Sequence, residues 1–132
     1  MMRLPELKHL LTYDNESVVN RFHSENPERS IEQARYIFKD LLAWLWLGAK
    51  RKNARLETHM IGPLHVLDAM WHVFILDTVT YHAFCLNYFG QYLHHHQQPI
   101  GYEYVISPDE LSEFLNDCYD YLGEDWLGRN FA

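Results

Sequence analysis

Glycine, proline and cysteine are scarce in this chain, which has six, five and two of them among its 132 residues. Two cysteines far apart in sequence form neither a disulfide framework nor a Cys-x-x-Cys zinc pair, so we expect a reduced, cytoplasmic setting. Because turn-forming residues are few and apolar residues recur at helical spacing, the sequence favours helices over short strands.

Long apolar runs and catalytic fingerprints are also missing. The apolar run LLAWLWL, residues 41–47, is too short to cross a bilayer, and residues 1–10 lack the apolar centre of a signal peptide. No phosphate-binding loop, dinucleotide motif or Gly-x-Ser-x-Gly motif occurs. The sequence therefore predicts no membrane association, and it assigns no reaction.

Positive charge is in deficit. Eleven lysines and arginines face eighteen acids, giving a net charge of −7, and from Tyr102 onward there are eight acids and one base, Arg129. This sign opposes general affinity for nucleic acid. The one basic cluster, KRKNAR at residues 50–55, lies at a predicted helix end, where we expect a solvated face that complements the helix dipole.

The apolar pattern predicts an all-α protein with one domain, a compact bundle of five or six helices around a long core helix. Ser30 and Gln33 form a capping box at the start of that helix, which we place over residues 31–52. Apolar residues, among them Trp44 and Trp46, nearly encircle it, which is typical of a helix buried on all sides. The other predicted helices are 3–11, a short helix capped by Asp14, 63–76, 80–92 and 107–122.

The C-terminal third has clear start and stop signals. Ser107 and Pro108 fit the cap and first position of the last helix, and Gly123 fits its end. Residues 101–106 are expected to be extended. The apolar residues of the tail, 124–132, are expected to pack back onto the body.

Histidine is concentrated in residues 63–96, which hold six of the nine histidines and Cys85. We place a helix break near Asp77, and one unbroken helix over residues 63–92 is the alternative. Cys85 is interpreted as a buried structural thiol. His82, three residues before it on the same helix face, leaves a cysteine-dependent enzyme as a minor alternative.

Asp68 and His72 are four residues apart, so a helix presents both on one face. A carboxylate and an imidazole are ligands for zinc and other divalent transition metals, and His94 and His95 are the candidates to complete such a site. His65 shares the face and is a weaker candidate. The alternatives are a structural Asp68–His72 pair, or an acid–base pair in which the carboxylate fixes the imidazole tautomer.

One spacing in this stretch resembles that of a known family. The residues are Asp68, Trp71, His72, Tyr81, Cys85 and Gly90, in the pattern D-x2-W-H-x8-Y-x3-C-x4-G. The pattern resembles the glycine-rich domain-containing protein-like family, over about residues 60–98 and without its glycine-rich segment. Small bacterial members have a His-His pair after the glycine, as His94 and His95 do here, whereas plant members have a second histidine where this chain has Phe74. The resemblance implies a small helical domain with a site at Asp68, His72 and that pair, and it implies no reaction.

Two functions remain open at this point. We favour a protein-interaction or structural module, because the chain is small and completes no catalytic motif. Its contacts with a protein partner would come from aromatic surface residues, including Tyr102, Tyr104 and Trp126, and the acidic last helix would favour basic partners. The alternative is a divalent-metal-binding domain or metalloenzyme that uses Asp68, His72 and the His94–His95 pair.

Overall fold

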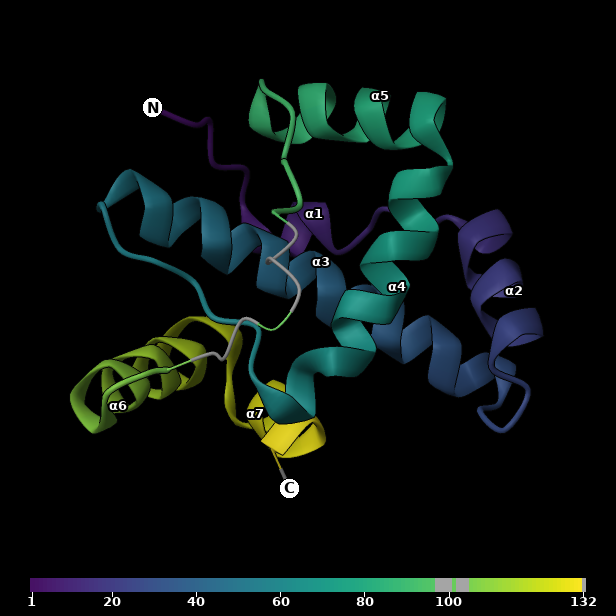
Figure 1. Cartoon of the computed structure of the whole chain (residues 1–132). Coiled ribbons are helices and arrows are strands. Elements are labelled where there is room, and N and C mark those ends of the chain that lie inside the picture. The colour runs from purple at the N-terminus through teal and green to yellow at the C-terminus, as the bar shows by residue number, and fades with distance from the viewer. Residues whose placement is uncertain (97–100, 102–104, 132) are drawn as a thin grey trace.

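The computed structural model describes residues 1–96, 101 and 105–131, and these contain seven α-helices and no strand. Helices surround one long central helix (Figure 1), which confirms the predicted all-α bundle. The helices are α1 (Leu7–Leu10), α2 (Glu16–Glu25), α3 (Ile31–Asn53), α4 (His65–Leu76), α5 (Thr78–Phe89), α6 (Pro108–Asp117) and α7 (Glu124–Phe131). The seventh helix forms in the tail that was expected only to pack back. None of the described helices is both long and apolar enough to span a membrane.

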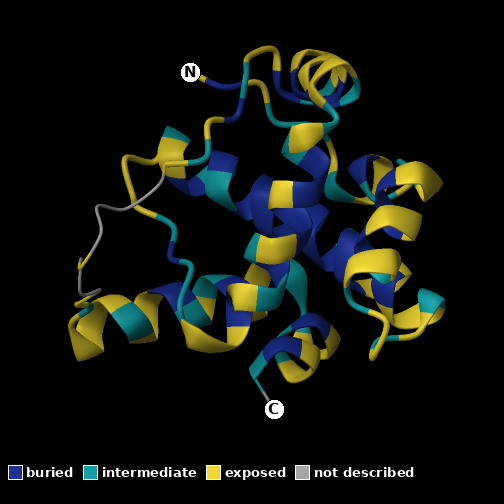
Figure 2. Ribbon diagram, turned by 45° about the vertical axis from the view of Figure 1, so that its right-hand side comes forward, coloured by how far each residue is buried: buried dark blue, intermediate teal, exposed yellow. Residues whose placement is uncertain are grey.

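Helix α3 is the core helix that its sequence predicts. The Ser30 hydroxyl accepts a hydrogen bond from the backbone of Gln33 at 3.1 Å, and the Gln33 side chain accepts one from the backbone of Ser30 at 2.8 Å, so the capping box is confirmed. Trp44 and Trp46 are buried, and their indole nitrogens donate to the carbonyl groups of His59 and Pro5. Buried residues gather where the other helices meet this one (Figure 2).

The predicted break between α4 and α5 is confirmed, because Asp77 has a non-helical backbone (φ −84°, ψ 70°). Helix α5 begins at Thr78 and ends at Phe89, so the predicted end at residue 92 is wrong. The reason is Gly90, whose φ of +74° is left-handed and stops the helix. Residues 91–96 are therefore free to turn back across the molecule.

Two smaller predictions also need correction. Asn15, and not Asp14, caps α2 by accepting a hydrogen bond from the Val18 amide, while Asp14 pairs with Lys39. In the basic cluster, Arg51 is 4 % exposed and not solvated. Its guanidinium forms an ion pair with Asp117, at the end of α6, and donates to the Glu57 carbonyl at 2.9 Å.

The C-terminal helices are held onto α3 by polar contacts as well as apolar ones. Ser107 caps α6 by accepting from the Glu110 amide at 3.1 Å, as predicted, and Gly123 (φ +92°) precedes α7. Trp126 is 2 % exposed and donates to the Asp40 carbonyl, and the Arg129 guanidinium makes two hydrogen bonds to the Asp40 carboxylate. The tail packs back as predicted, but Trp126 is consequently not a surface residue for a partner.

Candidate metal site

Asp68 and His72 lie one turn apart on α4, as their spacing predicts. His72 Nε2 is 3.7 Å from Asp68 Oδ2, and the side chains are 53 % and 30 % exposed. The helix keeps both on one face because residues four apart lie above one another. This pair supplies one imidazole and one carboxylate at the surface of the bundle.

His95 completes the cluster from a segment far away in sequence. Its Nε2 lies 2.6 Å from Asp68 Oδ1 and 3.1 Å from His72 Nε2. Each of the three residues offers one possible metal-ligand atom, and these three atoms lie within 4.8 Å of one another. A carboxylate oxygen only accepts, so His95 donates its Nε2 proton to Asp68, and His72 Nε2 faces a ring nitrogen whose proton is already used. A cation bound here would displace that proton, and the carboxylate oxygen and the two imidazole nitrogens would then be its ligands.

A buried hydrogen-bond chain holds the segment that carries His95. The Trp71 indole donates to the Tyr81 hydroxyl at 2.9 Å, and that hydroxyl donates to the Leu93 carbonyl at 2.6 Å. The Trp71 ring also packs against the His95 ring, with the centroids 4.4 Å apart. Because Tyr81 is fully buried, its hydroxyl fixes the position of the 91–96 segment against α4.

Two further residues of the sequence pattern, Gly90 and Cys85, lie in the same part of the chain. Gly90 ends α5 and lets the chain reverse, and Cys85 is buried. Burial raises the pKa of the Cys85 thiol, and hydrogen bonds with the Leu93 backbone and the Tyr81 hydroxyl offset this in part. A buried, protonated thiol is a poor nucleophile. His82 is exposed, with its ring against Tyr92, so the cysteine-dependent alternative gains no support.

Three of the four predicted ligands therefore come together, and His94 does not join them. The His94 ring packs against Tyr92, with centroids 4.8 Å apart, and lies 6.3 Å from the ring of His96. His94 and His96 are exposed, whereas Leu93 and His95 face inward. His65, the weaker candidate, lies outside the group of three donor atoms.

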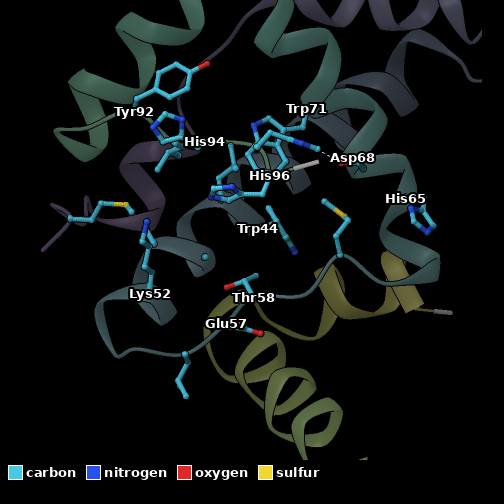
Figure 3. A pocket seen from close by; sticks show the side chains of 18 residues that line it. Trp44, Lys52, Glu57, Thr58, His65, Asp68, Trp71, Tyr92, His94 and His96 are labelled. Carbon is cyan, nitrogen blue, oxygen red and sulfur yellow. Dashed lines mark hydrogen bonds and ion pairs between the residues drawn. The ribbon is translucent and has the colours of Figure 1, made fainter. Parts of the chain in front are cut away.

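A cavity of about 840 Å³ lies beside the three residues, with Asp68 and His95 in its wall. Figure 3 shows Asp68 and Trp71 on one side of the cavity, Lys52 on the other, and Trp44 between them in this view. Trp44 and Lys52 come from α3, and Thr58 comes from the linker after it. The sequence predicted no place in the site for these three residues, because nothing in their local pattern links them to the histidine-rich stretch.

Two predicted regions are left without a structural account. Residues 102–104, which include Tyr102 and Tyr104 of the predicted partner surface and half of the predicted extended piece, lie outside the described residues. With Trp126 buried, none of the three residues predicted for that surface is available as an exposed contact in the described part of the chain.

Comparison with known proteins gives one family. The family model described as UCP032817-like matches residues 7–104, which include Asp68, His72 and His95 and end before α6. Neither the curated proteins nor the solved structures contain a match. The resemblance to the glycine-rich domain-containing protein-like family stays a prediction. The UCP032817-like model matches well over half of the residues of this chain, and the chain therefore belongs to the UCP032817-like family.

Proposed function

We propose that this protein binds a divalent transition metal ion through Asp68, His72 and His95. The observation that carries the proposal is the convergence of two imidazole nitrogens and a carboxylate oxygen from two separate segments. The tether through Trp71, Tyr81 and Leu93 supports it, because it orders His95 without using any of the three donor atoms.

The separations between the donor atoms fit a small metal ion. Two ligands that each lie about 2.0–2.1 Å from a tetrahedral zinc ion are about 3.3 Å from one another. The two imidazole nitrogens are 3.1 Å apart, and the two carboxylate oxygens of Asp68 lie 2.6 Å (Oδ1) from His95 Nε2 and 3.7 Å (Oδ2) from His72 Nε2. One ligand atom from each residue lies within 4.8 Å of the others. His72 is half exposed, so its ring has room to adjust. Small side-chain rotations would bring all three atoms into a coordination sphere.

The ligand set also indicates the kind of site. Two histidines and one carboxylate suit zinc and iron(II), and three protein ligands leave at least one coordination position open. Structural zinc sites are closed by four protein ligands. The proposed site therefore binds or activates a further molecule, and the adjoining cavity gives that molecule access. We place this function above an interaction module, whose predicted surface loses Trp126 to the core.

The test is a metal titration of protein purified without a histidine tag. We expect one equivalent of zinc per chain, measured by calorimetry and by elemental analysis. Asp68→Asn, His72→Gln and His95→Gln each weaken binding by at least roughly tenfold, since a lost ligand costs more than a lost supporting contact.

The matched controls are His94→Gln and His96→Gln, which flank His95 and are exposed. Both should keep an affinity within about twofold of the parent protein, because their rings lie outside the cluster. If these controls lose as much affinity as His95→Gln, the histidine run chelates metal adventitiously and the proposal fails. Absence of stoichiometric metal in the parent protein contradicts it outright.

A further inference from the structure

Aromatic side chains line part of the cavity beside the proposed metal site. The buried rings of Trp44 and Trp71 lie 5.4 Å apart at 61° and both line it, together with Tyr92. Its volume, about 840 Å³, lies within the range typical of small-molecule sites. Aromatic walls with a few polar groups are characteristic of sites that enclose small organic molecules.

A glycine lies in the wall of this cavity. Gly48 lies inside α3 and lines the cavity, although glycine is unfavourable within a helix. A Cβ atom built there would meet only the Thr58 side chain, at 3.6 Å or more, which is ordinary contact. Close packing therefore does not require glycine at this position. Larger side chains would extend from this position toward the cavity.

An unpaired hydroxyl also lines the cavity. Thr58 Oγ1 is buried and has no hydrogen-bond partner among the described residues, and Thr58 is part of the cavity wall. A buried polar atom without a partner is unfavourable. Thr58 Oγ1 has almost no accessible surface, so a bound polar group would satisfy it only after the Thr58 side chain rotates about its Cα–Cβ bond toward the cavity. Figure 3 shows Thr58 below Trp44, away from Asp68.

The charged groups that line the cavity determine whether it favours an anionic or a cationic ligand. The ionisable lining includes Lys52 and the carboxylates of Glu57 and Asp68. With a divalent ion at Asp68, the ion and Lys52 together outweigh the two carboxylates, so an anion is favoured. The open metal position would accept a carboxylate oxygen, a ligand type that zinc takes readily.

We propose that the cavity binds a small organic carboxylate with an aromatic body, whose carboxylate takes the open metal position and whose far end hydrogen-bonds Thr58. This inference rests on the proposed metal site and names the class of molecule it serves. The body lies against Trp44 and Trp71. The positions that define the cavity, Gly48 and Thr58, are not metal ligands, so the two ideas are separable by experiment.

The experiment uses 3-(4-hydroxyphenyl)propionate as the probe and calorimetry on zinc-loaded and chelator-treated protein. Two matched compounds each change one feature: 3-phenylpropionate lacks the hydroxyl, and tyramine replaces the carboxylate with an amine. We expect the probe to bind only in the presence of zinc, and we expect no binding of tyramine. The affinity for 3-phenylpropionate should be roughly fivefold to tenfold lower than that for the probe, because one hydrogen bond is missing.

Two variants locate the molecule. Gly48→Leu places a large apolar side chain in the cavity wall and should weaken probe binding at least about tenfold while zinc affinity stays unchanged. Thr58→Val removes the unpaired hydroxyl, so it should not lower the melting temperature, yet it should erase the preference for the probe over 3-phenylpropionate. The second variant keeps the test valid if leucine at position 48 disturbs folding.

The outcomes separate the two proposals. If zinc does not bind, the metal site fails and this inference fails with it. If zinc binds but the probe does not, or tyramine binds equally well, or Gly48→Leu leaves probe affinity unchanged, the metal site stands and the carboxylate cavity is rejected.

Discussion

His95 Nε2 lies 2.6 Å from Asp68 Oδ1, although the two residues are 27 positions apart in the chain. The contact forms because α5 stops at Gly90 and the following segment is tied to α4 through Trp71 and Tyr81. The residues of this sequence pattern thus form one structural unit, and that unit positions the His95 imidazole.

Removing the Tyr81 hydroxyl tests that unit. In Tyr81→Phe the Trp71 indole and the Leu93 carbonyl lose their shared partner inside the core, so we expect a loss of about 1–3 kcal/mol in the free energy of unfolding. We also expect weaker zinc binding, because His95 is less well ordered. Urea denaturation and a zinc titration measure the two effects.

The matched control is Tyr88→Phe, which removes a hydroxyl from the same aromatic cluster at a half-buried position. We expect little change in either measurement. Equal zinc affinity in Tyr81→Phe and the parent protein would show that the tether does not position His95.

Gly90 is the second element of the unit. Its left-handed φ of +74° disfavours any residue with a Cβ, so Gly90→Ala should lower the free energy of unfolding by about 1–2 kcal/mol. A clash is not the cause, since the added Cβ would meet the Arg3 side chain only at 3.7 Å or more. Chemical denaturation measures the loss.

Gly128→Ala provides a control of opposite sign. Gly128 lies within α7, has no atom within 4 Å of a built Cβ and has no left-handed φ, so alanine should stabilise the protein by up to about 1 kcal/mol. Destabilisation in both variants would mean that the backbone argument at Gly90 is wrong.

His59 should make stability depend on pH. It is buried, and burial, followed by the charge of Arg51, lowers the pKa of its imidazole below the usual value. In the unfolded chain the His59 imidazole titrates at about pH 6.5. Below that pH the unfolded chain therefore binds more protons than the folded protein does. The free energy of unfolding consequently falls as the pH drops. Denaturation at pH 7 and pH 5 measures the fall.

In His59→Gln this contribution to the pH dependence disappears, because glutamine does not titrate. The variant should therefore lose less stability than the parent protein between pH 7 and pH 5. An identical loss in both proteins would show that His59 is not one of the groups responsible.

Local patterns predicted most of the fold. The capping box at Ser30 and Gln33 and the break at Asp77 depend on neighbours in sequence, and both are confirmed. The end of α5 was missed because the predicted helix, residues 80–92, placed Gly90 in its last turn, whereas the left-handed backbone of Gly90 ends the helix at Phe89. Because of this error, the sequence did not predict that residues 91–96 form a non-helical segment whose side chains alternate between inward-facing and exposed.

The candidate site was predicted only in part, because only part of it depends on residues that are neighbours in sequence. Asp68 and His72 are fixed by one helix, so their pairing follows from spacing alone. The choice of His95 over His94 depends on which side of the 91–96 segment faces α4, and that is set by the Tyr81–Leu93 hydrogen bond. The cavity residues from α3 and its linker depend on long-range packing, which no local pattern encodes.

The most direct test of the metal site is a long-range proton–nitrogen NMR spectrum of the histidine side chains, recorded during a zinc titration. If the metal site exists, the Nε2 signals of His72 and His95 shift to the position of metal-bound nitrogen at one equivalent, while those of His82, His94 and His96 stay in place. Shifts at His94 and His96 with none at His72, or no shift at any ring nitrogen, would contradict it.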